Sequence, residues 1–290
     1  MNKRVTNILD RGDSVLVKCA DGTTYRGDIT VGADGIHSKV RQEMQRLAPP
    51  ELLVNDEKSI TAEYACFFGV SAPISELEDG ALHTVFDIDI SALLFVGNGK
   101  LPQWFFIAKM DRKYQGHEIP RYTQKEMEEQ VLEHGHFQFC AGITLKDLMA
   151  STTRLSYLAL EEAHHVVWTH KRIVCLGDSI HKMTPNLGQG GNQAIEGAAV
   201  LTNCLLEMFK TSKDEKVGME AIETALQKYQ RLRVKRAQKF IELSGMATRD
   251  EAMATLRHTL RFLFMPPSSE MISGKCSAFG RYLRLDTDWK

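Results

Sequence analysis

The chain has 290 residues, 43% of them hydrophobic and 25% charged, enough to bury the core of one large domain or two modest ones. Its formal net charge of -1 lacks the basic excess of a nucleic-acid-binding protein, so we expect a small-molecule partner. No apolar run is long enough for a membrane span and the N-terminus has no leader pattern, which predicts a cytoplasmic protein, with peripheral membrane association as an alternative.

The cysteines and histidines do not form a metal-binding pattern. The six cysteines include no C-x-x-C pair, so they are expected to be reduced thiols that are mostly buried. His164 and His165 follow two glutamates, but no matching ligand set stands elsewhere, and a solvated turn is the favoured interpretation. We therefore predict no metal site.

The first thirty residues read as short strands separated by turn residues. The apolar segments VTNIL, SVLVKCA and TYRGDITV are divided by Arg11-Gly12-Asp13 and by Asp21-Gly22, which is typical of a β-meander. The last of these strands ends in Gly32-Ala33-Asp34-Gly35. A short helix is then predicted from Ser38 to Leu47, before a Pro-Pro pair.

Residues 60–110 are rich in aromatic and β-branched types, which predicts a second, mostly antiparallel sheet with a hairpin turn at 97–100. A helix is then predicted to begin at Thr123, and a further short helix is predicted over 145–150. The apolar residues 172–176 do not alternate with polar ones, which favours a parallel strand buried on both faces. Two further helices are predicted around 195–205 and 222–232.

This order of elements predicts an α/β fold in which two lobes are interleaved along the chain. Residues 1–58 and 151–250 would form the first lobe, and residues 59–150 the second. Residues 251–290 would be a loosely packed C-terminal tail. The basic run from Arg231 to Lys239 is interpreted as a solvated helix face.

The stretch after the parallel strand has the composition of a ligand site. Ligands of open parallel sheets bind beyond the carboxyl ends of the strands, where Gly177-Asp178 is predicted to lie. Gly177 permits close approach of a ligand, and the Asp178 carboxylate can accept hydrogen bonds from a ribose. Residues 188–192 (GQGGN) open a helix whose N-terminus favours a negative group. The alternative is that the glycines only shape a loop and that Asp178 caps a helix.

Two motifs resemble those of the FAD-dependent monooxygenases of the aromatic-hydroxylase type, the class A flavoproteins. GDSIHKMTPNLGQGGNQAIEGA looks like the GD motif of that family, and DITVGADGIHSKVR is similar to its DG motif. The likeness is strongest to fungal epoxidases of indole-diterpene and meroterpenoid biosynthesis. It covers about residues 1–250.

The resemblance implies a Rossmann-like FAD-binding lobe, incomplete here, interleaved with a substrate-binding sheet. It further implies NAD(P)H as reductant, O2 as co-substrate, and epoxidation or hydroxylation of an apolar, prenylated secondary-metabolite precursor. The residues implied in cofactor binding are Asp34, Gly35, Arg41, Gly177, Asp178, Pro185, Gly188, Gly190 and Gly191. No catalytic residue is assigned. Phe86 and His37 are pocket candidates, although a packed Phe and a loop-shaping His are simpler interpretations, and His181 is treated like His37.

One family feature is absent from the sequence. Family members begin with a βαβ unit carrying G-x-G-x-x-G, but only 33 residues precede Asp34 and no such fingerprint occurs in the chain. We expect that FAD binds weakly, that another chain supplies the unit, or that the true start lies upstream of Met1. The alternative function is a truncated homologue without FAD that is inactive or only binds an apolar ligand.

Overall fold

The computed structural model describes residues 3–52, 57–212 and 217–255. The chain divides into two compact units, each assembled from three separate stretches of sequence. Unit 1 comprises Met1–Ala62, Lys113–Ile119 and Glu161–Met246, and unit 2 comprises Glu63–Arg112, Pro120–Leu160 and Ala247–Lys290. Most of the predicted tail lies outside the described residues. The assignment of the two predicted lobes to FAD and to substrate stays a prediction.

Unit 1 begins with the predicted meander. Strands β1 (Val5–Asp10), β2 (Val15–Cys19) and β3 (Thr24–Gly27) form an antiparallel sheet in chain order. The prediction of one strand over TYRGDITV is wrong, because β4 (Thr30–Gly32) leaves the meander and joins another sheet. β4 pairs with β13 (Ile173–Cys175) instead. Arg172 adds two bonds beside this pairing: its side chain donates to the carbonyl of Asp28 (3.0 Å), and its own carbonyl accepts from Thr30 N (2.8 Å).

The second sheet of unit 1 contains the predicted parallel pair. Its order is β12 (Thr169–His170), β13 (Ile173–Cys175), β4, and β13 runs parallel to β4 with Cys175 opposite Gly32. All three β13 residues are buried, as expected for a strand covered on both faces. Helix α1 (Lys39–Leu47) packs against β4 so closely that a Cβ on Gly32 of β4 would lie 2.8 Å from the Cβ of Val40. Only glycine fits there.

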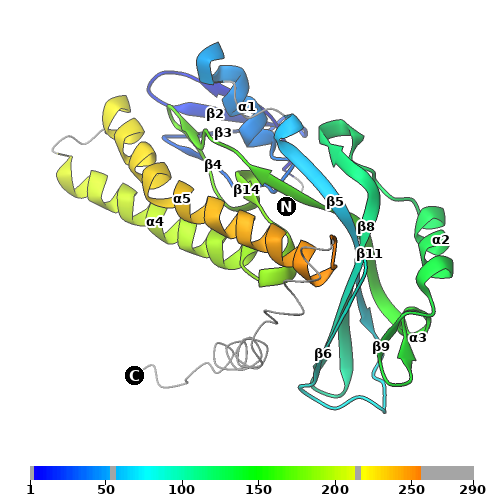
Figure 1. The fold of residues 1–290 in the computed structure, drawn as a ribbon. Helices are drawn as coiled ribbons and strands as arrows, with labels where there is room; N and C mark the ends of the chain where they lie inside the picture. Colours follow the sequence, from blue (N-terminus) through cyan, green and yellow to red (C-terminus); the bar gives the residue numbers. More distant parts are fainter. Residues whose placement is uncertain (1–2, 53–56, 213–216, 256–290) are drawn as a thin grey trace, which may run out of the picture. The chain divides into compact units, whose positions relative to one another are not determined.

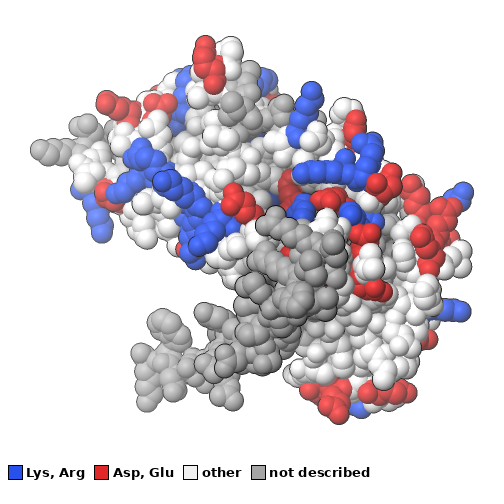
Figure 2. Space-filling model, viewed as in Figure 1, with Lys and Arg blue, Asp and Glu red and all other residues white. Residues whose placement is uncertain are grey.

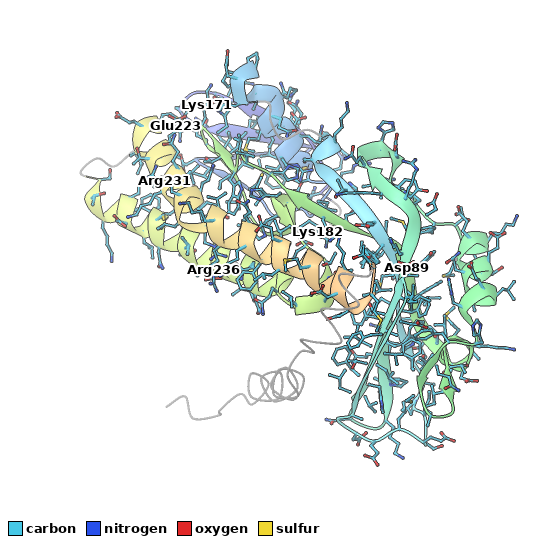
Figure 3. All side chains as sticks on the ribbon, viewed as in Figure 1. Asp89, Lys171, Lys182, Glu223, Arg231 and Arg236 are labelled. Carbon is cyan, nitrogen blue, oxygen red and sulfur yellow. The ribbon has the colours of Figure 1, made fainter. Side chains whose placement is uncertain are left out.

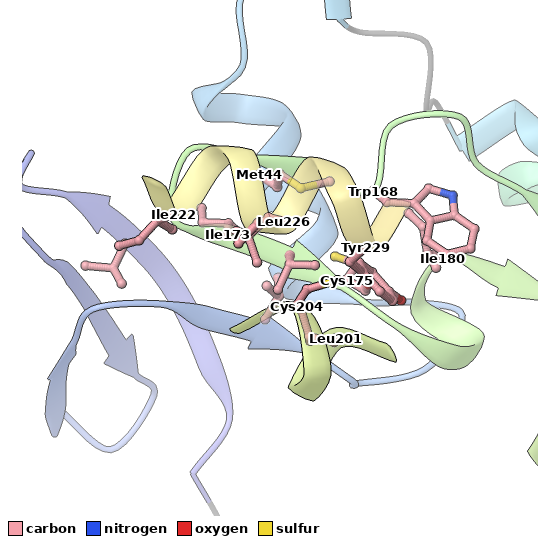
Figure 4. Close-up of a cluster of buried hydrophobic side chains, with 14 of the residues drawn as sticks. Met44, Trp168, Ile173, Cys175, Ile180, Leu201, Cys204, Ile222, Leu226 and Tyr229 are labelled. Atoms are coloured by element: carbon pink, nitrogen blue, oxygen red, sulfur yellow. The ribbon is translucent and has the colours of Figure 1, made fainter. Parts of the chain in front are cut away.

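Two long helices complete unit 1 and lie side by side (Figure 1): α4 (Gly190–Thr211) and α5 (Met219–Glu251). An ion pair joins them, Lys228 Nζ to Glu207 Oε2 at 2.6 Å. Their apolar faces meet α1 and β13 in one hydrophobic cluster, shown in Figure 4. Its central members are Met44, Trp168, Ile173, Cys175, Ile180, Leu201, Cys204, Ile222, Leu226 and Tyr229.

Unit 2 is built on the predicted second sheet. Its strands lie in the order β11, β5, β8, β7, β6. Their bounds are β5 (Ile60–Ser71), β6 (Leu82–Asp87), β7 (Ile90–Gly97), β8 (Leu101–Gln115) and β11 (Thr152–His164). The last residues of β11, Ala163 and His164, belong to unit 1 and pair there with the short strand β14 (His181–Lys182). The hairpin turn at 97–100 is confirmed, because β7 and β8 pair in antiparallel orientation and Gly97 lies opposite Leu101.

The predicted helices of unit 2 are also present. They are α2 (Gln124–His134) and α3 (Leu145–Ala150), and each begins with a capping box, Thr123 with Glu126 and Thr144 with Asp147. The short hairpin of β9 (Gln138–Cys140) and β10 (Ile143–Thr144) lies between them. The remaining short helical turns are η1 (Pro50–Leu52), η2 (Glu57–Ser59), η3 (Gly116–Glu118), η4 (Gly177–Ser179) and η5 (Pro185–Leu187).

The cysteines agree with a reduced protein. The five that the structure describes carry free thiols; Cys19, Cys66, Cys175 and Cys204 are buried, Cys140 is partly buried, and Cys276 falls outside the described residues. Among the helices of residues 3–52, 57–212 and 217–255, none combines the length and the apolar character that crossing a bilayer demands.

Candidate functional site

The two glycine motifs meet at the end of the parallel pair in unit 1. β4 and β13 finish side by side at Gly32 and Cys175, and Leu176 N donates to the Gly32 carbonyl (2.9 Å). Two loops that are far apart in sequence therefore leave the sheet together, at the edge where ligands of parallel sheets bind. The structure brings the predicted residues of both motifs into one region.

Ser179 and Arg41 tie these two loops together. The Ser179 hydroxyl lies 2.7 Å from the Gly32 carbonyl and accepts from Leu176 N (3.1 Å). Arg41 is buried, and its guanidinium donates to the carbonyls of Ser179 (2.5 Å) and Ile36 (2.7 Å). The resemblance implied that Arg41 supports the cofactor. In the structure its guanidinium forms an internal brace, a pair of hydrogen bonds that connects the two loops. Sequence reasoning missed Ser179, although a serine directly after Gly-Asp at a strand end was a usable signal.

Asp34 organises the start of α1. Its carboxylate accepts hydrogen bonds from the Ser38 hydroxyl and from the N–H groups of Lys39 (2.8 Å) and Val40 (3.1 Å). The Ser38 hydroxyl in turn accepts from Arg41 N (2.9 Å) and caps the helix. Gly35 has a positive φ of 81°, which glycine adopts without strain. The DG motif is therefore held by its own hydrogen bonds.

Asp178 follows Gly177 in the η4 turn and pairs with Lys182 of β14, at 2.6 Å from Oδ2 to Nζ; Figure 3 labels Lys182. The interpretation of Asp178 as a cap of the following helix is wrong, because α4 begins twelve residues later, at Gly190. Gly177 has a φ of 66°, and a Cβ there would meet the Cβ of Ala194 at 3.2 Å. This loop therefore packs closely against α4.

The N-terminus of α4 is open. Pro185 starts the η5 turn, Gly188 ends it at a φ of 61°, and Gln189 places no side-chain hydrogen bond on the helix that follows. Beyond its chain neighbours and the backbone of its own helix, a Cβ on Gly190 or Gly191 would meet no heavy atom of the described residues within 4 Å. The first N–H groups of a helix lack intrahelical partners and carry partial positive charge. This arrangement fits a negatively charged group.

The structure gives the remaining candidates, His37, Phe86 and His181, three different environments. The His37 side chain is exposed, and its Nε2 lies 3.2 Å from Glu161 Oε1. Phe86 is half-buried in unit 2, on β6 opposite Ser91. His181 is fully buried against Trp168, and neither ring nitrogen has a hydrogen-bond partner among the described residues. Burial lowers the pKa of His181 to about 4, so its ring is neutral at pH 7.

The solvated turn predicted at His164 and His165 is wrong. β11 extends to His164, and the following residue is buried, with its Nδ1 3.1 Å from the Ser59 hydroxyl and its N–H bonded to the Ile180 carbonyl. Burial lowers the pKa of His165 to about 3. No cluster of His, Cys, Asp and Glu that could hold a metal ion occurs among the described residues.

A sequence comparison identifies the family of this chain. Residues 1–244, which include both motifs, match the FAD binding domain family. The chain belongs to this family. The glycine loop, the open α4 N-terminus and Asp178 fit such a cofactor, because a pyrophosphate and a flavin need anion-binding N–H groups and a ribose needs a carboxylate acceptor.

Similar proteins include fungal monooxygenases. The FAD-dependent monooxygenase verC1 of Penicillium polonicum is 41% identical over 266 residues, 91% of this chain and 33% of the relative. The FAD-dependent monooxygenase nodM of Hypoxylon pulicicidum is 38% identical, over 89% of this chain and 56% of the relative. The chain thus spans a third to about half the length of these relatives.

A solved structure supports the fold. A variant of HpxO from Klebsiella pneumoniae, complexed with FAD, superposes with a TM-score of 0.70 at 21% identity, covering 95% of this chain and 67% of the other. The α/β fold predicted from the sequence, a Rossmann-like lobe interleaved with an antiparallel sheet, agrees with this neighbour and with the family.

Proposed function

We propose that this chain forms much of a FAD-dependent monooxygenase that uses NAD(P)H and O2 to epoxidise or hydroxylate an apolar, prenylated secondary-metabolite precursor. Family membership and the names of the fungal relatives support the reaction class. The observation that carries the proposal is the open N-terminus of α4. Gly190 and Gly191 are the first two residues of this helix, and a side chain at either position would meet nothing beyond its chain neighbours and the backbone of its own helix within 4 Å.

The chain's own residues would bind and orient the cofactor. N–H groups of the first turn of α4 would hold a negatively charged part of FAD, and Asp178 would accept a ribose hydroxyl. Gly188 and Pro185 shape the approach to α4, while Arg41 and Ser179 keep the neighbouring loop in place. When bound, FAD supplies the redox chemistry that takes electrons from NAD(P)H and activates O2.

The aromatic side chains on one face of the unit 2 sheet support the proposal of an apolar substrate. Side chains alternate along β8, so Trp104 and Phe106 enter the core with α2 and α3, while Phe105 lies on the opposite face. On that face the Phe105 ring lies 4.9 Å from the ring of Phe68, which is 36% exposed, and 6.3 Å from that of Phe95. These partly open aromatic rings suit a prenyl chain or a polycycle.

Phe86 belongs to the same face. It pairs with Ser91, which in turn pairs with Ile107 two residues beyond Phe105, and directly paired strand residues point to the same side of a sheet. We propose Phe86 as part of the apolar wall rather than as a proton-transfer group, since its ring has no titratable atom.

Replacing Gly191 with alanine tests the cofactor site directly. We expect Gly191→Ala to keep or raise the melting temperature without FAD, because the new methyl group meets no neighbouring side chain and alanine has a higher helix propensity than glycine. The same variant should bind FAD at least about tenfold more weakly, because the methyl group occupies space that the cofactor needs. Flavin fluorescence titration gives the affinity and scanning calorimetry the melting temperature.

The matched control is Gly27→Ala at the end of β3, where a Cβ meets only the Ile29 carbonyl at 3.6 Å. FAD affinity should be unchanged in that variant. A wild-type protein that takes up no FAD would instead support the alternative, a homologue that only binds an apolar ligand. Equal FAD affinity of wild type and Gly191→Ala would remove the glycine pair from the site.

A further inference from the structure

One arginine of the basic run on α5 does not face water. Figure 2 shows basic side chains gathered over the surface where α5 runs, and Arg231, Lys235, Arg236 and Lys239 are exposed. Arg233 is only 2% exposed. The prediction of a uniformly solvated helix face is therefore wrong at this position. Burying a guanidinium costs several kcal/mol unless neighbouring groups or a ligand compensate it.

The Arg233 side chain reaches the first turn of α4. Its Nη2 donates to the side-chain oxygen of Gln193 (2.7 Å), and its Nη1 lies 3.0 Å from Glu196 Oε2. Gln193 is itself buried, and its N–H makes an early bond of the helix, to the Gln189 carbonyl (2.9 Å). The Nε of Arg233 is buried with no hydrogen-bond partner among the described residues. One donor of this side chain is thus left unused.

The electrostatics of this position are unfavourable in the absence of an anion. The N-terminus of a helix is already partially positive, so a buried cation beside the first turn of α4 adds like charge. Glu196 compensates only in part, because it is 39% exposed and shared with the surface residue Arg236, whose Nε lies 2.8 Å from it. An excess of positive charge therefore remains at the end of α4 where Gly190 and Gly191 are open.

The same face of α5 also fixes the other end of the GD loop. Tyr229, one turn before Arg233, donates from its buried hydroxyl to the Cys175 carbonyl at the end of β13 (3.3 Å). A Cβ on Gly197 of α4 would lie 3.5 Å from that hydroxyl, so the helices are in close contact there. Residues 176–192 are consequently held at both ends by one turn of α5.

From these contacts we infer that Arg233 is a positioning residue that orients the first turn of α4 and adds positive charge to the anion site formed by that turn. The inference rests on the proposed FAD site. The reduced flavin carries a negative charge that the oxidised flavin lacks, and the positive charge of Arg233 therefore stabilises the reduced form more than the oxidised one.

Variants with and without the charge separate this role from packing. In Arg233→Met we expect the affinity for reduced FAD to fall about tenfold more than the affinity for oxidised FAD, which lowers the two-electron midpoint potential by about 30 mV. Arg233→Lys keeps the charge but loses the planar fork, so most of the potential should be retained. The potential is measured by dye-coupled reduction of the protein-bound flavin.

The matched control is Lys235→Met, which removes an exposed positive charge of the same helix and should leave the potential unchanged. If Arg233→Met does not fold, Arg233→Gln serves as the uncharged variant and should show the same shift. Equal potentials in wild type and the uncharged variant, or equal shifts in the uncharged and lysine variants, would overturn the inference. A wild-type protein that binds no FAD would refute the proposed function as well as the inference.

Discussion

The Asp178 side chain is partly exposed, and its backbone is held in place by the surrounding fold. It follows a glycine with positive φ, at the end of a buried strand, and its partner Lys182 is likewise partly exposed. Exposed ion pairs of this kind contribute about 0–1 kcal/mol to folding. The fold therefore depends little on this carboxylate, and its proposed role in binding the ribose can be tested without unfolding the protein.

We expect Asp178→Ala to weaken FAD binding by about tenfold or more, because a charge-assisted hydrogen bond contributes roughly 1.5–3 kcal/mol. The free energy of unfolding should change by less than about 1 kcal/mol. Isothermal titration with FAD and urea denaturation measure the two quantities. Asp21→Ala is the control, since Asp21 also pairs with a lysine, Lys3, but lies in the meander. Unchanged FAD affinity in Asp178→Ala would contradict the ribose assignment.

At the scale of elements, α1 shows how the DG motif is maintained. The helix begins after Ser38, which caps it, and Asp34 adds a second acceptor from four residues upstream of that cap. Two acceptors at one helix start stabilise both the helix and the loop before it. The family resemblance assigns Asp34 to cofactor support, and the hydrogen bonds of the folded chain give it a structural role as well.

Asp34→Ala should lower the free energy of unfolding by about 1–2 kcal/mol, because two backbone N–H groups at the start of α1 lose their acceptor. Urea denaturation followed by far-UV circular dichroism measures this loss. Asp28→Ala provides the comparison, since this exposed aspartate precedes β4 and should be neutral. A variant as stable as wild type that binds FAD poorly would favour the direct cofactor role of Asp34.

Elements with strong local patterns were predictable from the sequence. The meander turns, the α2 start at Thr123 and the non-alternating strand at 173–175 all depend on neighbouring residues. The split between β3 and β4 was not predictable, because it depends on the pairing of β4 with β13, far along the chain. The burial of Arg233 and His165 was missed for the same reason: a charged or polar residue looks solvated until distant partners are known.

Within the candidate site, residue types were more predictable than contacts. The sequence singled out Asp178 and the glycines of α4, which lie at one strand end as expected. It did not reveal that Arg41 would be an internal brace or that Ser179 would join two loops. Those bonds connect segments more than 130 residues apart, beyond the range of any local pattern.

At the scale of the whole molecule, burial of histidines makes stability depend on pH. Burial lowers the folded-state pKa of His181 to about 4 and that of His165 to about 3, whereas both have a pKa of about 6.5 in an unfolded chain. Between these values the unfolded chain binds more protons than the folded one. Their stabilising contribution is therefore complete above about pH 6.5 and is lost as pH falls toward 4.

We expect the free energy of unfolding to decrease from pH 7 to pH 4.5, with each such histidine adding at most about 1.4 kcal/mol per pH unit. In His181→Phe, whose ring can still pack against Trp168, this pH dependence should be weaker. His117→Gln, at an exposed position, should keep the wild-type slope. The measurement is urea denaturation at a series of pH values. Parallel slopes in wild type and His181→Phe would contradict the burial argument.

The parallel pairing of β4 with β13 has a consequence for how the protein is made. Residues 33–172 separate the two strands, so their contact has a very high sequence separation. During synthesis at about 5–20 residues per second, β4 would wait roughly 7–28 s for its partner to leave the ribosome. Until then the Gly32 edge has no neighbour from β13, and unpaired strand edges promote aggregation. The short length of β4, three residues, limits this exposure during biogenesis.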